Sequence, residues 1–89
     1  MYKNKCNDRN NICGINIAKI RKKMTPKMSQ RALAEKLQII GLDVDKNAIQ
    51  RIENGKRFVT DIELLSFSQL FNIPADLLLR SDDIPGEHL

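Results

Sequence analysis

Two charged side chains occupy positions of this sequence where a helix would normally place an apolar residue. In the segment INIAKIRKKM, the residues spaced as one helix face are Ile17, Ile20, Arg21 and Met24. In a later segment, Glu53 shares the inward face of a helix with Ile49 and Ile52. An unpaired buried charge is costly, whereas two opposite charges satisfy one another. We therefore expect these two helices to pack face to face through Arg21 and Glu53.

The rest of the pattern predicts short helices throughout and an all-α fold. The expected helices cover residues 15–24, 30–40, 46–54, 60–71 and 75–80. The breaks between them contain residues that end or begin helices, namely Pro26, Gly41, Gly55 and Pro74. Suitable N-caps are Ser29, Asp45 and Thr60, the last in a capping box with Glu63. Five short helices with brief connections predict a compact helical globule.

At 89 residues the chain is expected to form one domain around a single core. Aromatic residues are scarce, so that core must be mainly aliphatic. The second helix is expected to face inward with Leu33, Ala34, Leu37 and Ile40, and the fourth to present Ile62, Leu65 and Phe71. Polar composition predicts that the first eleven residues are mobile, within a polar N-terminal arm of residues 1–13. A polar tail is expected over 81–89, which leaves 14–80 as the domain.

The net charge of +4 is distributed unevenly along the chain. Residues 1–31 carry nine Lys and Arg against one acid, while residues 58–89 carry one basic residue against six acids. A basic N-terminal part is suited to binding a polyanion, and an acidic C-terminal part is suited to contact with solvent or with a protein partner. The alternative is two solvated surfaces without a partner, and charge alone does not separate the two interpretations.

No run of the sequence predicts a membrane span or a signal peptide, so we expect a cytoplasmic protein. Cys6 and Cys13 match no metal-binding or CxxC spacing. In a reducing compartment we expect free, structurally minor cysteines, with a redox switch or a shared metal site as the alternative. No cofactor or metal is expected, and nothing resembles a nucleophile with its base, because the one histidine, His88, lies in the tail.

The runs SQRALAEKL and NAIQRIENGKRFVTDIELL resemble the Cro/repressor-type (xenobiotic-response-element, XRE) helix-turn-helix family. The similarity covers about residues 14–80, and its most specific part is IENGKR, which follows SQ and LA by a helix, a turn and a helix. The resemblance implies a five-helix, lambda-repressor-like DNA-binding domain. Its second and third helices would form the DNA-binding unit, with the third helix in the major groove.

The resemblance also assigns roles to individual residues. Lys46, Asn47 and Arg51, with Gln50 beside them, match the base-reading positions, and their alternative is an ordinary solvated helix face. The residues that match contacts to the DNA backbone are Gln30, Asn54, Lys56 and Arg57, with solvation as their alternative. Arg21 and Glu53 match a pair that bridges the first and third helices.

Two connections are longer than the family pattern. The loop KKMTPKM adds Lys27 to a basic run, and QIIGLDVD replaces a shorter turn, so we expect an extra turn at the end of the second helix. Asp45 would oppose a close phosphate and is expected to act only as an N-cap. Arg9 in the arm is a candidate for the minor groove.

The expected function is a transcriptional regulator, a repressor that binds double-stranded DNA at a pseudo-palindromic operator. Such a site requires a homodimer, for which the candidate surface comprises Leu77, Leu78, Leu79 and Ile84. The alternative is a protein-interaction module, such as an antitoxin or an anti-regulator, that binds its partner through the acidic residues 58–89. We do not expect an enzyme.

Overall fold

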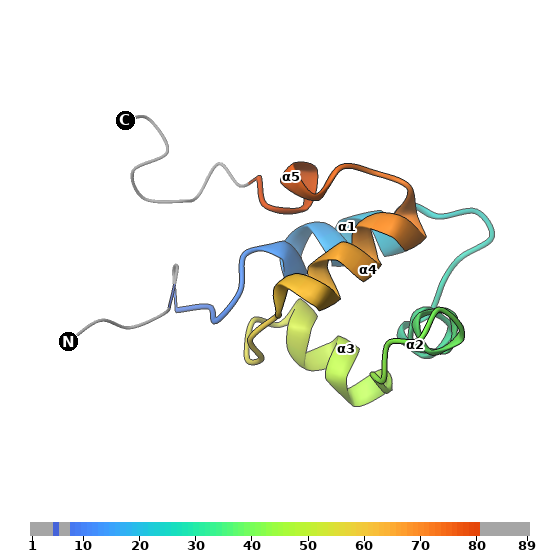
Figure 1. Ribbon diagram of the computed structural model, residues 1–89, viewed down its shortest axis with the longest axis horizontal. Coiled ribbons are helices and arrows are strands. Elements are labelled where there is room, and N and C mark those ends of the chain that lie inside the picture. Colours follow the sequence, from blue (N-terminus) through green and yellow to red (C-terminus); the bar gives the residue numbers. More distant parts are fainter. Residues whose placement is uncertain (1–4, 6–7, 81–89) are drawn as a thin grey trace.

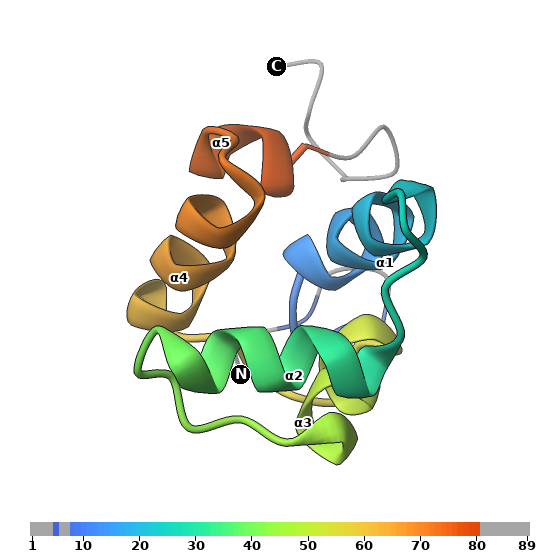
Figure 2. The ribbon, with the colours of Figure 1, turned by 90° about the vertical axis from the view of Figure 1, so that its right-hand side faces the viewer.

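The computed structural model describes residue 5 and residues 8–80, and its regular elements are all α-helices. They are α1 (Cys13–Lys23), α2 (Gln30–Ile39), α3 (Lys46–Glu53), α4 (Asp61–Phe71) and α5 (Ala75–Leu78). Helix α1 packs on α3, α4 and α5, while α2 packs on α3 and α4 (Figures 1 and 2). The expected five-helix, all-α fold is confirmed. None of the described helices is long and apolar enough to span a bilayer.

The predicted N-caps form at three of the helices. The Ser29 hydroxyl accepts a hydrogen bond from the Ala32 amide at 3.0 Å, and Asp45 Oδ1 accepts one from the Ala48 amide at 2.8 Å. Thr60 and Glu63 form the complete capping box at the start of α4. Each cap satisfies an amide that has no partner inside its helix, and such a cap stabilises a helix by about 1 kcal/mol.

Helices α2 and α3 end in the same way, at glycines with a left-handed backbone. After α2, Gly41 has φ +98° and the Leu42 amide donates to the Leu37 carbonyl at 2.9 Å. After α3, Gly55 has φ +83° and the Lys56 amide donates to the Arg51 carbonyl at 2.9 Å. Both are Schellman caps, whose left-handed position favours glycine because it has no Cβ. Helix α2 therefore ends at Ile39, close to its expected end.

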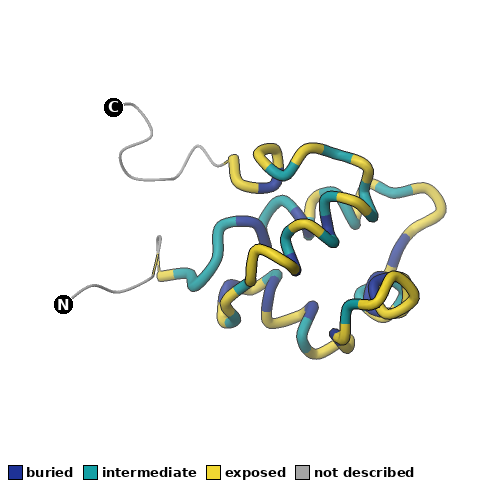
Figure 3. The backbone as a smooth tube through the Cα atoms, in the orientation of Figure 1, coloured by how far each residue is buried: buried dark blue, intermediate teal, exposed yellow. Residues whose placement is uncertain are grey.

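The buried core is mainly aliphatic, as expected, with one phenylalanine. Its fully buried large side chains are Ile17, Leu33, Leu37, Val44, Ile49, Ile52, Phe67 and Leu78. Figure 3 shows buried stretches alternating with exposed ones along the helices. Truncating one of these side chains to alanine typically costs about 2–5 kcal/mol.

Three apolar residues that were expected on inward faces lie on the surface instead. Ile40 is 48% exposed, because it is the C-cap of α2 and not part of its inward stripe. Ile62 and Leu65 are 70% and 55% exposed. Their positions follow from the capping box, which turns the side of α4 that carries Glu63 toward the protein. Phe67, one turn further along α4, shares that buried side.

The domain begins earlier than expected. Helix α1 starts at Cys13, and residues 9–11 are bonded to the last turn of α3 and to the segment that follows it. The prediction of a mobile arm over the first eleven residues is therefore wrong for residues 9–11, because their side chains find backbone carbonyls to bind. The expected tail, 81–89, lies outside the described residues.

Candidate nucleic-acid interface

The outward side of α3 carries a set of polar side chains opposite its buried apolar side. Ile49 and Ile52 are fully buried, and the two sides are separated because the polar residues fall at i, i+1, i+4 and i+5. The exposed set is Lys46, Asn47, Gln50 and Arg51. None of these four side chains hydrogen-bonds to another described residue. This side of α3 is therefore available to an external ligand.

The inward side of α3 holds the predicted ion pair. Arg21 donates from Nε and Nη2 to the two carboxylate oxygens of Glu53, at 2.7 and 2.9 Å. The two side chains are only 12% and 8% exposed. The hydrogen bond to Glu53 raises the pKa of Arg21, although burial acts against it. Arg21 also donates to the Met28 carbonyl at 3.1 Å, so the pair ties α1 to α3 and to the start of α2.

Gln30 joins this pair from the first position of α2. Its Nε2 donates to Glu53 Oε1 at 3.0 Å, and the residue is half-buried. A side-chain amide has two donor hydrogens and one acceptor oxygen, so this bond leaves donor capacity on Gln30. The structure thus brings the predicted phosphate ligand next to the predicted structural pair.

The loop after α3 carries the other predicted backbone ligands, in two different environments. Asn54 and Lys56 are exposed, and Asn54 Oδ1 accepts from the Lys56 amide at 3.2 Å. Arg57 is instead paired with Glu63, through two hydrogen bonds at 3.0 and 2.9 Å. Its guanidinium is therefore directed toward α4, which residue type and spacing did not predict.

Burial and pairing act on Glu63 in opposite directions. Burial by itself raises the pKa of this carboxyl, but the hydrogen bonds from Arg57 and Thr60 outweigh it, so the pKa lies below its ordinary value. The same bond to Glu63 raises the pKa of Arg57. Glu63 thus fixes both the start of α4 and the end of the preceding loop.

The side chain of Arg9 lies against α3, whereas a residue that enters the minor groove would extend away from the domain. Its Nη2 donates to the carbonyls of Ile52 and Glu53, at 3.2 and 2.9 Å. Those carbonyls lie in the last turn of α3, whose acceptors have no i+4 amide inside the helix. Arg9 thus binds the protein, whereas the sequence left open whether the arm folds onto the domain or onto DNA.

Of the four residues expected at a dimer surface, the structure describes three. Leu77 and Leu79 are 39% and 42% exposed, whereas Leu78 is fully buried in the core. Leu78 is therefore not a surface residue, because α5 presents only part of its circumference to solvent. Ile84 lies outside the described residues.

The structure offers little for other chemistry within its described part. Cys13 is a free thiol in the core, and burial raises its pKa to about 11, so it is a poor nucleophile at neutral pH. Cys6 lies outside the described residues. Across residue 5 and residues 8–80, no three acidic, His or Cys side chains gather where they could share a metal ion.

Comparison of the sequence with models of known protein families shows which family this chain belongs to. A helix-turn-helix family model of the Cro/C1 type matches residues 17–78, well over half of the chain. The chain belongs to the Cro/C1-type helix-turn-helix family. The resemblance seen in the sequence is therefore confirmed. Comparisons with curated proteins and with solved structures gave no match.

Membership in the helix-turn-helix family identifies the kind of partner that this chain has. The chain is a DNA-binding regulator of this type, and DNA is its partner. The family is regulatory and not typically enzymatic. The matched region starts after residues 9–11, so these residues lie outside it, although the carbonyls that they bind lie within it.

Proposed function

We propose that this helix-turn-helix protein is a transcriptional repressor that inserts α3 into the major groove of a specific operator. The observation that carries the proposal is the exposed polar side of α3, whose four side chains have no hydrogen-bonding partner among the described residues. The major groove accommodates an α-helix and displays a distinct donor and acceptor pattern for each base pair. Repression would follow from occlusion of a promoter that overlaps the operator.

The four side chains have the chemistry that base recognition requires. Arg51 and Lys46 can donate to O6 and N7 of guanine, while Asn47 and Gln50 can pair with N6 and N7 of adenine. Lys46 and Asn47 begin the helix, and in helix-turn-helix proteins the N-terminal part of the recognition helix contacts bases. We therefore propose Lys46, Asn47, Gln50 and Arg51 as the base-reading set.

Contacts to phosphates would position α3 on the duplex. We propose Gln30, Asn54 and Lys56 for this role, supported by the spare donor of Gln30 and by the exposure of the other two. Arg57 remains a candidate through donors that its pairing with Glu63 leaves free, since a guanidinium carries five N–H groups. Its contribution should be smaller, because the paired guanidinium is held against α4.

We propose that the repressor binds as a homodimer through α4 and α5. Support comes from a group of exposed apolar side chains in this half of the chain: Phe58, Ile62, Leu65, Leu77 and Leu79. A two-fold dimer would place two copies of α3 on half-sites about one helical turn apart. Of the leucines that the sequence suggested for the dimer surface, Leu77 and Leu79 are exposed and remain candidates.

The test is a selection of bound duplexes from a random DNA pool with the wild-type protein, followed by a salt titration of the enriched duplex. We expect a palindromic motif and a log–log salt slope of roughly −4 to −6, from neutralising several phosphates at about 0.9 each. If no duplex is enriched at physiological salt, the proposal fails. Capture of a protein partner through the acidic residues 58–89 would then be the function to test.

A further inference from the structure

The loop between α3 and α4 is held by two asparagines that precede α1. The Asn10 amide donates to the Gly55 carbonyl at 2.7 Å, and Asn10 Nδ2 donates to the Lys56 carbonyl at 3.1 Å. Asn11 Nδ2 donates to the Arg57 carbonyl at 2.7 Å. The carbonyls of three consecutive loop residues, 55–57, are therefore bound by two consecutive residues that precede α1.

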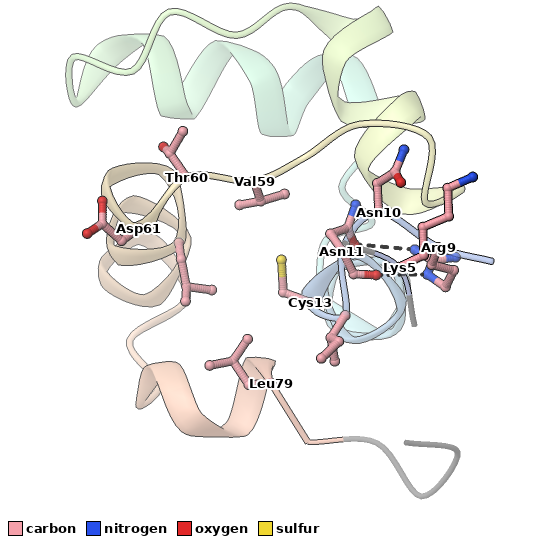
Figure 4. A pocket seen from close by; sticks show the side chains of 11 residues that line it. Lys5, Arg9, Asn10, Asn11, Cys13, Val59, Thr60, Asp61 and Leu79 are labelled. Carbon is pink, nitrogen blue, oxygen red and sulfur yellow. Dashed lines mark hydrogen bonds between the residues drawn. The ribbon is translucent and has the colours of Figure 1, made fainter. Parts of the chain in front are cut away.

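The last turn of α3 is bound in the same way. Arg9 donates to the carbonyls of Ile52 and Glu53, and Asn11 Nδ2 donates to the Ile52 carbonyl at 3.0 Å. A cation at the C-terminus of a helix also opposes the partial negative charge that collects there. Figure 4 shows Arg9, Asn10 and Asn11 lying beside one another, across a cleft of about 500 Å³ from Thr60 and Asp61.

Two glycines make this close approach possible. A Cβ on Gly14 would lie 2.0 Å from the Ile52 carbonyl oxygen, and one on Gly55 would lie 2.8 Å from Cγ of Arg9. The obstacle at Gly14 is backbone that cannot move aside, whereas the obstacle at Gly55 is the side chain of Arg9, which would have to shift. The close approach of this part of the chain to α3 therefore depends most strongly on Gly14.

We propose that residues 9–11, here called the clamp segment, position the α3–α4 loop for its contacts with the DNA backbone. The proposal rests on the proposed function, because Asn54 and Lys56 of this loop are the phosphate ligands proposed above. A loop whose carbonyls are bound has fewer accessible conformations, so its amides and side chains meet the duplex with less entropy to lose. The clamp segment lies before the region that matches the family model.

Asn11→Asp is the substitution that isolates the clamp segment. Asn11 Oδ1 accepts a hydrogen bond from the Gly14 amide at 2.8 Å and so supports the first turn of α1. Aspartate keeps this acceptor but removes the donor that binds Ile52 and Arg57. The variant should therefore keep α1 while freeing the Arg57 carbonyl of the loop and loosening the loop at that residue.

Asn16→Asp is the matched control. Asn16 Nδ2 also donates to two backbone carbonyls, those of Leu78 at 2.9 Å and Arg80 at 2.6 Å, but these belong to α5 and the residues that follow it and not to the α3–α4 loop. The control removes the same donors and adds the same charge. Any effect of net charge or of general destabilisation should then appear in both variants, and hydrogen exchange measured without DNA separates loosening of the loop from local repulsion between the new carboxylate and phosphates.

The first measurement is the salt dependence of binding to the enriched duplex, at a temperature where circular dichroism shows both variants to be folded. We expect Asn11→Asp to have a salt slope shallower by about 0.9 for each phosphate that the released loop no longer neutralises, and Asn16→Asp to keep the wild-type slope. A decrease in folded protein alone would lower the active fraction without changing the slope. An unchanged slope in folded Asn11→Asp would overturn the proposal.

The second measurement needs no DNA and so separates this inference from the proposed function. The Lys56 and Arg57 amides donate to the Arg51 carbonyl at 2.9 and 3.2 Å, so their hydrogen exchange reports on the loop. We expect faster exchange of both amides in Asn11→Asp and not in Asn16→Asp. If the wild-type protein selects no duplex, the proposed function fails, and the exchange rates alone test the clamp segment. Unchanged exchange of the two amides in Asn11→Asp would overturn the proposal that the clamp segment holds the loop. Faster exchange would support it.

Discussion

The two ends of α3 are held in different ways. At its N-terminus, the helix is capped by the side chain of Asp45, and Lys46 and Asn47 project into solvent. At its C-terminus, Glu53 receives hydrogen bonds from Arg21 and Gln30, and the backbone of the last turn is bound by residues from before α1. One helix of eight residues thus has a free end and an anchored end.

The contrast separates recognition from stability along a single element. Side chains proposed to contact bases are free of internal bonds, so changing them should leave the fold intact. Side chains at the anchored end connect α3 to α1 and α2, so changing them should destabilise the domain. An exposed substitution usually changes stability by no more than about 0.5 kcal/mol, whereas breaking a buried ion pair costs several times that amount.

The largest effect is expected from Glu53→Gln at the anchored end. The substitution leaves the guanidinium of Arg21 largely buried without its counter-charge, and should lower the free energy of unfolding by about 3–5 kcal/mol. Urea denaturation followed by circular dichroism measures this change. Lys46→Gln at the free end is the control. An equal decrease in the free energy of unfolding of the two variants would show that the two ends of α3 do not differ in their contribution to stability.

Asn47→Ala tests the free end. It should weaken binding to the selected duplex by about 1–3 kcal/mol, roughly 5- to 150-fold, if the amide pairs with a base. The free energy of unfolding should stay within about 0.5 kcal/mol of wild type. Fluorescence anisotropy and urea denaturation give the two values, and a variant that loses stability but not affinity would reverse the assignment.

Glu63→Gln sharpens the comparison by testing the support behind the loop. Because the pKa of folded Glu63 lies below its ordinary value of 4.5, its contribution to stability is complete above about pH 4.5 and disappears as pH falls through the folded pKa. At pH 7 we expect the variant to be less stable by about 1–2 kcal/mol, a value reduced by the partial exposure of Arg57. Denaturation across pH 2–7 should show the two proteins converging at the acid end, and a difference that does not depend on pH would contradict the role of the charge.

The smallest effect is expected from Lys56→Ala. Removing one cation from the phosphate backbone should make the log–log salt slope shallower by about 0.9, without altering which bases are preferred. Salt titrations on two selected duplexes of different sequence provide the measurement. A change in base preference would show that Lys56 contributes to specificity and not only to positioning.

The sequence predicted the features that depend on local chemistry or on an obvious electrostatic conflict. The Arg21–Glu53 pair followed from two charges on apolar stripes, and the caps at Ser29, Asp45 and Thr60 followed from residue type and spacing. Such features carry their own signal because a helix needs its terminal amides satisfied and a buried charge needs a partner.

The features that were missed arise from contacts between side chains and distant backbone. Arg9, Asn10 and Asn11 showed no periodicity, since hydrogen bonds to carbonyls impose no repeating pattern on a sequence. Gly14 was the available signal, because a glycine within the first turn of a helix often marks a close backbone approach. The surface position of Ile62 was missed for a related reason, since Glu63 was considered a cap and not an inward-facing partner of a cation.

Recognition of bases by the exposed side of α3 can be measured by repeating the duplex selection with Arg51→Ala. We expect the variant to enrich the wild-type motif with its preference relaxed at one base position in each half-site, and to unfold with wild-type stability. If the enriched motif is unchanged at every position, or if no motif survives in a fully folded variant, α3 does not contact the bases in the way proposed.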